Sequence, residues 1–298
     1  IDQALHDITA KDLGVPIYRL LGGPVRDRVR MYDHLGGGRT RSVYEEESPE
    51  ALAELAAQCV ADGYDAIKVL PVGRTAAIDG AATVRRAERL MRAVREAVGE
   101  DVDVMIDLHG RTTSTAAIEY GRALAPYRPW FIEEPVQPGN VAAMAEVARA
   151  LPIPIAAGER LVSRQEFGAL FEARAVAVAQ PDVCHAGGLS EVRRIAALAE
   201  SYGVSMAPHN PLGPIATMAS IQLAVALPNF LIQEALRSDV PWRYDVVSGC
   251  LPVKGGRVGL PTGPGIGIEV DEAEAARHPW APEPLLRWFH DDGSVADW

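Results

Sequence analysis

The sequence predicts an α/β protein folded as a (β/α)8 barrel of the TIM type. Strand-like and helical segments alternate seven times along the chain, and an eighth strand follows the last helix. Most strand-like segments are apolar nearly throughout, as expected when both faces of a parallel sheet are covered. The chain has 298 residues, of which 48% are hydrophobic, so it is long enough for one barrel with a large core.

The predicted elements follow one another at regular intervals. We expect strands at residues 28–34, 66–71, 102–107, 129–133, 153–158, 176–181, 204–208 and 229–233. We expect helices at about 48–62, 81–98, 114–125, 140–150, 163–172, 188–202 and 214–227. The first of these helices has clear boundaries: Ser48 is a typical N-cap, Pro49 suits the first helical position, and Gly63 can adopt the left-handed conformation that ends a helix.

Three parts are expected along the chain. Residues 1–25 are predicted to form a linker helix that leads from a capping domain largely absent from this chain, because the sequence starts in mid-helix without a capping residue. Residues 26–237 form the barrel. Residues 238–298 are rich in glycine and proline and are expected to wrap over the barrel or over the preceding domain. The loops 35–47 and 73–80 are expected to influence substrate selection.

Composition excludes several classes of function. A formal net charge of -11 gives no electrostatic reason to expect nucleic-acid binding, and an anionic substrate would need a local positive centre such as a bound metal. The three cysteines form no CxxC motif, which is typical of reduced thiols in a cytoplasmic protein. No signal peptide is visible, and the longest largely apolar stretch, 215–227, is too short to span a bilayer.

Three acids at equal intervals each follow a strand-like segment. Asp107, Glu133 and Glu159 are separated by 26 residues and again by 26 residues. A carboxylate at the end of an apolar strand is costly unless it is paired or binds a cation. Since parallel strands end at the same edge of a sheet, the three acids should converge there. Such an all-oxygen ligand set suits a hard ion such as Mg²⁺.

Seven consecutive strands present an ionisable residue at the end that carries the active site in such barrels. Any single one of them would be ordinary as a solvated loop charge, but all seven together point to one site. In strand order, these residues are Lys68, Asp107 with His109, Glu133, Glu159, Asp182, His209 and Glu234.

The motifs around these residues resemble the barrel domain of the enolase superfamily, in its mandelate racemase-like branch. They are most similar to galactonate dehydratase and related acid-sugar dehydratases. The matching segments are Ile106-Asp107-Leu108-His109-Gly110, Ile132-Glu133-Glu134-Pro135, Ala157-Gly158-Glu159, Gln180-Pro181-Asp182, His185-Ala186-Gly187-Gly188 and Ala207-Pro208-His209-Asn210-Pro211-Leu212-Gly213-Pro214. The resemblance covers nearly the whole chain and lacks only the α+β capping domain usual in this family.

The resemblance implies a Mg²⁺ site made by Asp107, Glu133 and Glu159. In the Glu133-Glu134 pair, the equal spacing and the family pattern favour Glu133, and Glu134 is expected to play a supporting role. In this family the ion holds the substrate carboxylate and stabilises the enediolate that forms when the α-proton leaves.

The remaining site residues receive roles from the same resemblance. His209 is the expected base, oriented by Asp182 through its other ring nitrogen. His109 is expected to protonate the departing 3-hydroxyl, with metal ligation as the rival role. Glu234 matches a family position that hydrogen-bonds the forming enediolate, whereas a structural salt bridge is its alternative role. Lys68 could neutralise the substrate carboxylate or contact the metal-binding acids.

Strand two departs from the racemases of the superfamily. They carry Lys-x-Lys there, and the second lysine is a base on the opposite face of the substrate. Here the segment is Ile67-Lys68-Val69-Leu70, and leucine cannot move a proton. One-base chemistry with His209 is therefore expected, and racemisation is disfavoured.

The resulting hypothesis is a Mg²⁺-dependent aldonate dehydratase that yields a 2-keto-3-deoxy sugar acid. A galactonate-type substrate is the first choice, and gluconate or mannonate is the alternative. A racemase or epimerase and a non-catalytic barrel subunit are the other hypotheses. We further expect a cytoplasmic homo-oligomer that binds a small-molecule sugar acid and neither nucleic acid nor membrane.

Overall fold

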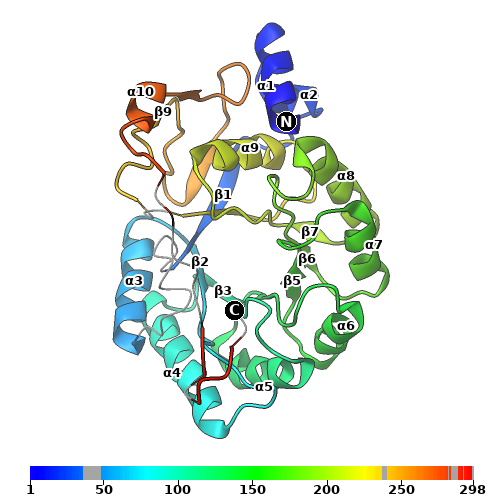
Figure 1. Cartoon of the computed structure of the whole chain (residues 1–298), viewed down its shortest axis with the longest axis vertical. Coiled ribbons are helices and arrows are strands. Elements are labelled where there is room, and N and C mark those ends of the chain that lie inside the picture. The colour runs from blue at the N-terminus through cyan, green and yellow to red at the C-terminus, as the bar shows by residue number, and fades with distance from the viewer. Residues whose placement is uncertain (36–47, 237–239, 281, 283–287, 291, 297–298) are drawn as a thin grey trace.

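Eight parallel strands form a ring with helices outside it, which confirms the predicted α/β barrel (Figure 1). The computed structural model describes residues 1–35, 48–236, 240–280, 282, 288–290 and 292–296, so most of the loop 35–47 lies outside the described residues. Each strand begins inside a predicted segment. The strands are β1 (Arg28–His34), β2 (Ala66–Val69), β3 (Asp103–Asp107), β4 (Ile132–Glu133), β5 (Ile155–Ala157), β6 (Val178–Ala179), β7 (Ser205–Met206) and β8 (Gln233–Ala235).

Several of the helices between the strands begin with side-chain caps, and the predicted N-cap Ser48 provides one of them. Ser48 accepts a hydrogen bond from the backbone N–H of Ala51, and Ser163 and Glu166 form a reciprocal capping box. Within the described part of the chain, every helix is too short or too polar to cross a membrane. The helices are α3 (Pro49–Ala61), α4 (Ala81–Val98), α5 (Ser114–Leu124) with the 3-10 turn η1 (Ala125–Tyr127), α6 (Val141–Ala150), α7 (Arg164–Glu172), α8 (Gly188–Ser201) and α9 (Pro214–Ala224).

The ring closes between its last two strands in two steps. Met206 on β7 pairs with Phe230 through an isolated parallel bridge. The chain then continues to β8, which pairs with β1 so that Glu234 lies beside Tyr32. The eighth strand was predicted at 229–233, but the regular strand β8 starts only at Gln233. The residues before it pair with β7 through an isolated bridge, which is too short to count as a strand.

Eight residues fill the interior of the barrel, one for each strand. Each lies in its strand or directly before or after it in the sequence. Most of these floor residues are apolar, and all eight are buried. They are Tyr32, Ala66, Met105, Phe131, Ala156, Val178, Ala207 and Ile232. A separate and larger apolar core lies between the sheet and the helices. This floor closes the barrel below the site described next.

Both ends of the chain pack against the barrel. The N-terminal segment forms two helices, α1 (Asp2–Asp12) and α2 (Ile17–Leu20), which lie near α8 and α9 in Figure 1. In the C-terminal tail, β10 (Arg257–Gly259) pairs antiparallel with β1, and β9 (Val247–Ser248) pairs with β11 (Glu269–Val270), which precedes α10 (Glu272–Ala275).

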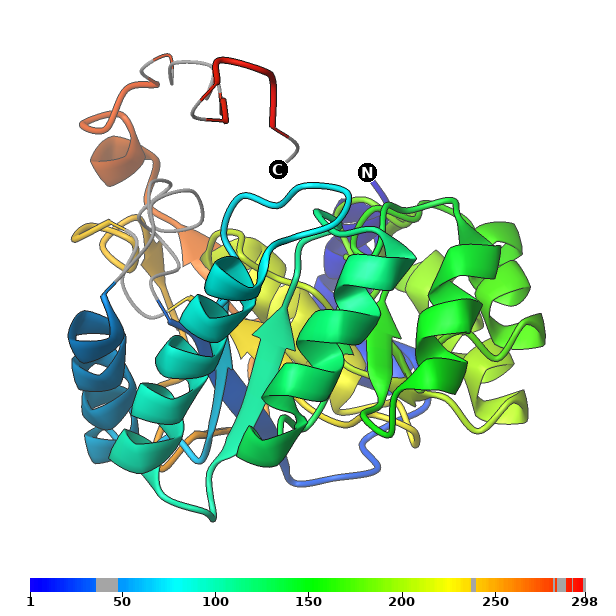
Figure 2. The ribbon, with the colours of Figure 1, turned by 90° about the horizontal axis from the view of Figure 1, so that it is seen from below.

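The end of the tail lies above the loops that follow β2 and β3. The guanidinium of Arg111 stacks 4.6 Å from the ring of Trp288, and Arg74 donates a hydrogen bond to the carbonyl of Phe289. Figure 2 shows this segment in red, above the end of the barrel toward which the strand arrows point. The tail therefore lies at the end that carries the predicted site.

Candidate active site

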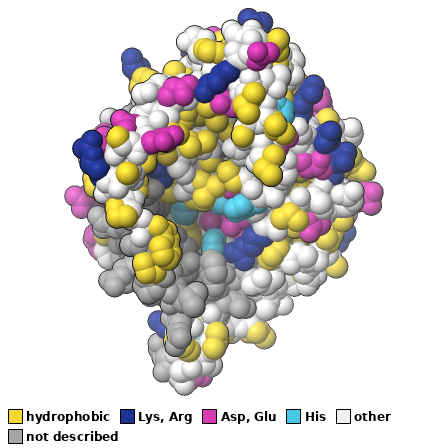
Figure 3. Space-filling view, turned by 45° about the horizontal axis from the view of Figure 1, so that its top comes forward, with side chains coloured by type: hydrophobic (Ala, Val, Ile, Leu, Met, Phe, Trp, Pro, Cys, Tyr) yellow, Lys and Arg dark blue, Asp and Glu magenta, His cyan; other side chains and the backbone are white. Residues whose placement is uncertain are grey.

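Side chains alternate along a strand, so the inward position next above each floor residue lies two residues further on. Six of the eight positions reached in this way carry an ionisable side chain. The eight residues are His34, Lys68, Asp107, Glu133, Gly158, Gln180, His209 and Glu234. Figure 3 shows acidic and histidine side chains gathered in a hollow on this face of the molecule. Five of the predicted site residues thus share one layer because of strand register alone.

Lys68 lies at the centre of this layer. Its Nζ is 2.9 and 3.0 Å from the carboxylate oxygens of Glu133, 2.7 Å from Oε1 of Glu234 and 3.8 Å from Oδ2 of Asp107. All four side chains are buried. Burial opposes the ammonium charge, but the surrounding carboxylates outweigh it and raise the pKa of Lys68 well above its usual value. Lys68 was expected either to neutralise the substrate carboxylate or to contact the metal-binding acids. In the structure it contacts Glu133 and lies 3.8 Å from Asp107.

One ammonium group does not balance the carboxylates around it. Burial raises the pKa of Glu133 well above its usual value, Lys68 opposes that shift, and Asp107 adds to it. The pKa of Asp107 itself is lowered, because Lys68 and His109 outweigh the effect of burial. The layer therefore holds more buried carboxyl groups than its one lysine can keep ionised.

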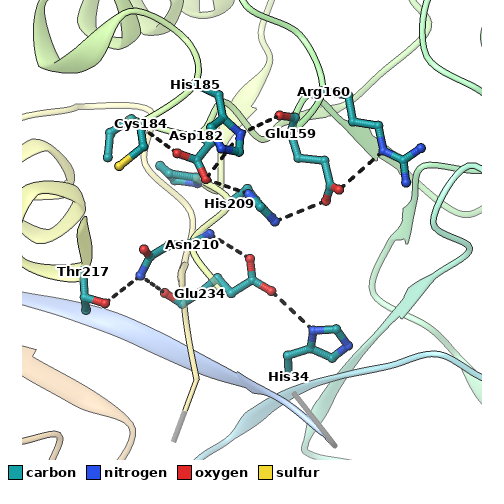
Figure 4. Close-up of polar contacts among 12 residues, drawn as sticks. His34, Glu159, Arg160, Asp182, Cys184, His185, His209, Asn210, Thr217 and Glu234 are labelled. Carbon is teal, nitrogen blue, oxygen red and sulfur yellow. Dashed lines mark hydrogen bonds and ion pairs between the residues drawn. The ribbon is translucent and has the colours of Figure 1, made fainter. Parts of the chain in front are cut away.

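His209 and Asp182 form the predicted dyad (Figure 4). Nδ1 of His209 is 2.8 Å from Oδ2 of Asp182, whose Oδ1 accepts a 2.6 Å hydrogen bond from the backbone N–H of Cys184. Nε2 of His209 faces Oε2 of Glu159 at 3.4 Å. Burial lowers the pKa of His209, but Glu159 and Asp182 outweigh it and raise that pKa to about 10. His185 lies nearby, 3.9 Å from Asp182, and is half exposed.

Glu234 is held on the opposite side of the layer from Glu159. Its Oε2 accepts a 2.9 Å hydrogen bond from the backbone N–H of Asn210, and its Oε1 contacts Lys68. Burial would raise the pKa of Glu234, but Lys68 and His209 outweigh burial and lower it to about 2. Nδ1 of His34 is 3.8 Å from the same carboxylate. Glu234 thus carries a stable negative charge inside the site.

Two non-glycine residues with left-handed backbone flank the metal-binding candidates on β3 and β4. His109 has φ 53° and Glu134 has φ 39°, a conformation that costs energy and is concentrated at functional sites. The backbone N–H of His109 donates a 2.7 Å hydrogen bond to Asp107. Burial lowers the pKa of His109 and raises the pKa of Glu134 to about 8.

Arg160 is a site residue that the sequence reasoning missed. Its Nε is 3.1 Å from Oε2 of Glu134 and 3.7 Å from Oε1 of Glu159, and its Nη2 contacts both Nδ1 and the carbonyl of His109. Its position directly after Glu159 was the one available signal. Arg160 thus adds a permanent positive charge beside Glu134, Glu159 and His109.

The three expected metal ligands reach the same end of the barrel but do not surround a common point. Asp107 and Glu133 are register partners on β3 and β4, whereas Glu159 follows β5 in a loop and faces His209. In the residues that the structure describes, no three His, Cys, Asp or Glu side chains converge closely enough to hold a metal ion. The donors still fit Mg²⁺ in kind, because all three are carboxyl groups and two of them, Asp107 and Glu133, are buried among further acids. Binding would require their side chains to reorient.

Comparisons with known proteins agree with this architecture. The family described as enolase C-terminal domain-like matches residues 51–274. The chain is 41% identical to D-galactonate dehydratase of Ralstonia nicotianae, with coverage of 100% of this chain and 78% of the relative. It is 37% identical to D-gluconate dehydratase of Thermoproteus tenax, with coverage of 96% of this chain and 58% of the relative.

The solved structures give the same result. A mandelate racemase/muconate lactonizing enzyme-like protein from Roseovarius sp. TM1035 superimposes with a TM-score of 0.88 at 37% identity, covering 98% of this chain and 74% of that one. The resemblance seen in the motifs is therefore confirmed: the chain belongs to the enolase superfamily, through the enolase C-terminal domain-like family.

Proposed function

We propose that the protein is a Mg²⁺-dependent dehydratase of an aldonic acid, which it converts to a 2-keto-3-deoxy sugar acid through an enediolate. D-galactonate is the first candidate and D-gluconate the second, after the names of the relatives. The observation that carries the proposal is the His209–Asp182 dyad, whose other ring nitrogen faces the carboxylate of Glu159 in a site crowded with further carboxyl groups.

Asp107, Glu133 and Glu159 would hold the metal ion. When bound, Mg²⁺ supplies positive charge that attracts the substrate carboxylate and favours loss of the adjacent proton. The excess of buried carboxylate around Lys68 supports this assignment, because a further cation would relieve the unfavourable ionisation of Glu133.

His209 would remove the proton from C2 through Nε2. Asp182 supports this role because it accepts the Nδ1–H and leaves Nε2 as the nitrogen that faces the cavity. Beside Glu159 and Asp182, the pKa of His209 is about 10 and the ring is protonated at neutral pH. The base role therefore requires a positive charge that offsets Glu159, which a metal ion bound there would provide.

His109 and Glu234 would act after that proton is lost, His109 on the departing 3-hydroxyl and Glu234 on the enediolate. Nε2 of His109 lies 3.9 Å from Glu159, on the cavity side of its ring, where it can donate to the departing 3-hydroxyl. Glu234 would hydrogen-bond an enediolate oxygen only in its protonated form, because an ionised carboxylate has no proton to donate. Its pKa of about 2 would therefore have to rise when the anionic substrate binds beside it. Lys68 would keep Glu133 and Glu234 in place through its contacts with both.

Racemisation fits the site less well. Inversion needs a second base opposite His209, and the position two residues after Lys68 is Leu70. Lys68 itself is a poor base, because its raised pKa keeps it protonated. The expected homo-oligomeric state and cytoplasmic location stay predictions.

The test is a screen of the full gene product, with Mg²⁺, against a stereochemically varied panel of aldonates. We expect one of them, D-galactonate first, to give a 2-keto-3-deoxy acid. A folded protein that binds Mg²⁺ but forms no keto acid from any aldonate would overturn the proposal. Inversion at C2 with solvent deuterium incorporation would instead establish a racemase.

A further inference from the structure

Arg160 uses its guanidinium to connect three parts of the site. Its Nε pairs with Glu134 at 3.1 Å, and its Nη2 lies 3.0 Å from the carbonyl oxygen of His109 and 3.1 Å from Nδ1 of the same residue. Nη2 carries two hydrogens, which is enough for one bond to each acceptor on His109. A single side chain thus contacts both the backbone and the ring of His109.

The direction of the ring contact determines where His109 carries its proton. A guanidinium only donates hydrogen bonds, so Nδ1 of His109 must be the acceptor. A neutral imidazole that accepts at one nitrogen carries its proton on the other. The proton therefore lies on Nε2, the atom that faces Glu159 at 3.9 Å.

The backbone around the guanidinium is shaped to receive it. His109, Gly110 and Glu134 all have positive φ, and each lies against Arg160. A Cβ at Gly110, where φ is 69°, would lie 3.3 Å from Nη1 of Arg160. Left-handed backbone at two non-glycine positions costs energy and persists when the surrounding structure requires it. A glycine at position 110 thus leaves room for the guanidinium of Arg160, and a larger residue there would crowd it.

We propose that Arg160 is a positioning residue that holds His109 as the neutral tautomer with its proton on Nε2 and directs that N–H into the cavity. Glu134 anchors the guanidinium from the other side. The inference rests on the proposed function in one respect, namely that the Nε2–H of His109 is offered to the departing hydroxyl. The inference gives Arg160, which directly follows the expected metal ligand Glu159, a role of its own in the site.

The tautomer can be measured directly by NMR on protein with 13C- and 15N-labelled histidine. The His109 signal is assigned by its loss in His109→Gln. We expect wild type to show the 13Cδ2 and 15N shifts of the Nε2–H tautomer. Arg160→Gln should move them toward the average of free histidine. A wild-type spectrum of the Nδ1–H tautomer, or an unchanged His109 signal in folded Arg160→Gln, would overturn the inference.

Two further variants keep the test decisive if Arg160→Gln folds poorly. Gly110→Ala brings a Cβ to 3.3 Å from Nη1 and should push the guanidinium by a few tenths of an ångström, at some cost in backbone strain, so the same His109 signal should shift. Arg164→Gln is the matched control, because Arg164 lies on α7 and pairs with Glu191 instead. The inference fails if Gly110→Ala leaves the signal unchanged or if Arg164→Gln shifts it as much as Arg160→Gln does.

Kinetic measurements can show whether Arg160 acts by fixing the tautomer of His109 or only by its positive charge. Arg160→Gln should lower kcat about 10- to 100-fold with little change in KM, because His109 no longer offers its proton in one direction. Arg160→Lys keeps the charge but lacks the planar donor array, so it should restore little of the loss. Full rescue by lysine would overturn the inference. If wild type converts no aldonate, the proposed function fails, and the NMR result still decides the role of Arg160.

Discussion

The two ends of the barrel carry charged clusters of opposite character. At the end where strands begin, Asp65 accepts hydrogen bonds from Arg30 at 2.9 Å and from Arg257 at 2.7 Å, and Arg30 also pairs with Asp103. Two arginines there face two aspartates. At the end where strands finish, Lys68 and Arg160 lie among a larger number of acids, most of them buried. That acidic set consists of Asp107, Glu133, Glu134, Glu159, Asp182 and Glu234.

The difference indicates which cluster is complete. The arginines at the first end lower the pKa of Asp65 against the effect of burial, as expected for a satisfied ion-pair network. At the second end, burial and neighbouring acids raise the pKa of Glu133 instead. A balanced cluster stabilises the fold by itself, whereas an unbalanced one stores unfavourable charge that a ligand can relieve. In TIM barrels these two ends serve stability and catalysis, respectively.

Removing the dyad histidine should have the largest effect. His209→Asn keeps a donor for Asp182 but provides no base, so kcat should fall about 10²- to 10⁴-fold with a smaller change in KM. Steady-state kinetics on the aldonate identified in the screen would measure it. His185→Asn is the control, since His185 lies beside the same dyad but is half exposed, and it should change kcat only a few-fold. Equal losses in both variants would contradict the assignment of His209.

Removing the buried lysine should destabilise the protein strongly. Lys68→Met leaves Glu133 and Glu234 buried without their cation, and breaking such a pair costs about 3–5 kcal/mol of unfolding free energy. Urea unfolding in EDTA measures this without rescue by a metal ion. Lys254→Met, at an exposed position, should change the free energy of unfolding by less than about 0.5 kcal/mol. A loss below about 1 kcal/mol in Lys68→Met would show that Lys68 does not balance these acids.

Magnesium should stabilise the protein through the unbalanced cluster. At free Mg²⁺ near 100 times its Kd, binding to the folded state adds about 2.7 kcal/mol to the unfolding free energy. EDTA should remove this gain, and Glu159→Gln should reduce it, in thermal unfolding experiments. Glu172→Gln is the matched control, because Glu172 is an exposed acid on α7. If Mg²⁺ stabilises Glu159→Gln as strongly as wild type, Glu159 is not a ligand.

The sequence predicts the strand-borne part of the site better than the loop-borne part. Lys68, Asp107, Glu133, His209 and Glu234 lie in one layer because strands alternate their side chains, and this period is readable from the chain. The contacts of Arg160 depend instead on the left-handed backbone of His109 and Glu134. Periodicity says nothing of such backbone angles, and neither residue is a glycine that would indicate them.

The bounds of the eighth strand also could not be predicted from the sequence pattern. The eighth strand was expected at 229–233, from its apolar residues, but the regular strand is Gln233–Ala235. Hydrophobicity marks the residues that are buried, which here include Ile232 of the floor. Backbone pairing with β1 is set by tertiary geometry, and it begins where the chain has passed the bridge at Phe230.

The balanced cluster should respond least to mutation. Asp65→Asn weakens the pairs with Arg30 and Arg257, and Asp65 is 43% exposed, so we expect a loss of about 1 kcal/mol at pH 6. Urea unfolding would measure it. Asp27→Asn removes a largely exposed acid that is 3.6 Å from Arg28, and it should have almost no effect.

The pH dependence of this small loss tests its cause. The folded pKa of Asp65 lies below its ordinary value of 3.8. At moderately acidic pH, Asp65 therefore binds fewer protons in the folded state than in the unfolded state. The stabilisation is complete above the unfolded pKa and disappears as pH falls through the folded pKa. The difference between wild type and Asp65→Asn should therefore shrink from about pH 4 downward. A difference that stays constant to pH 2 would mean that Asp65 acts through packing or neutral hydrogen bonds, and that the charge balance at this end does not stabilise the fold.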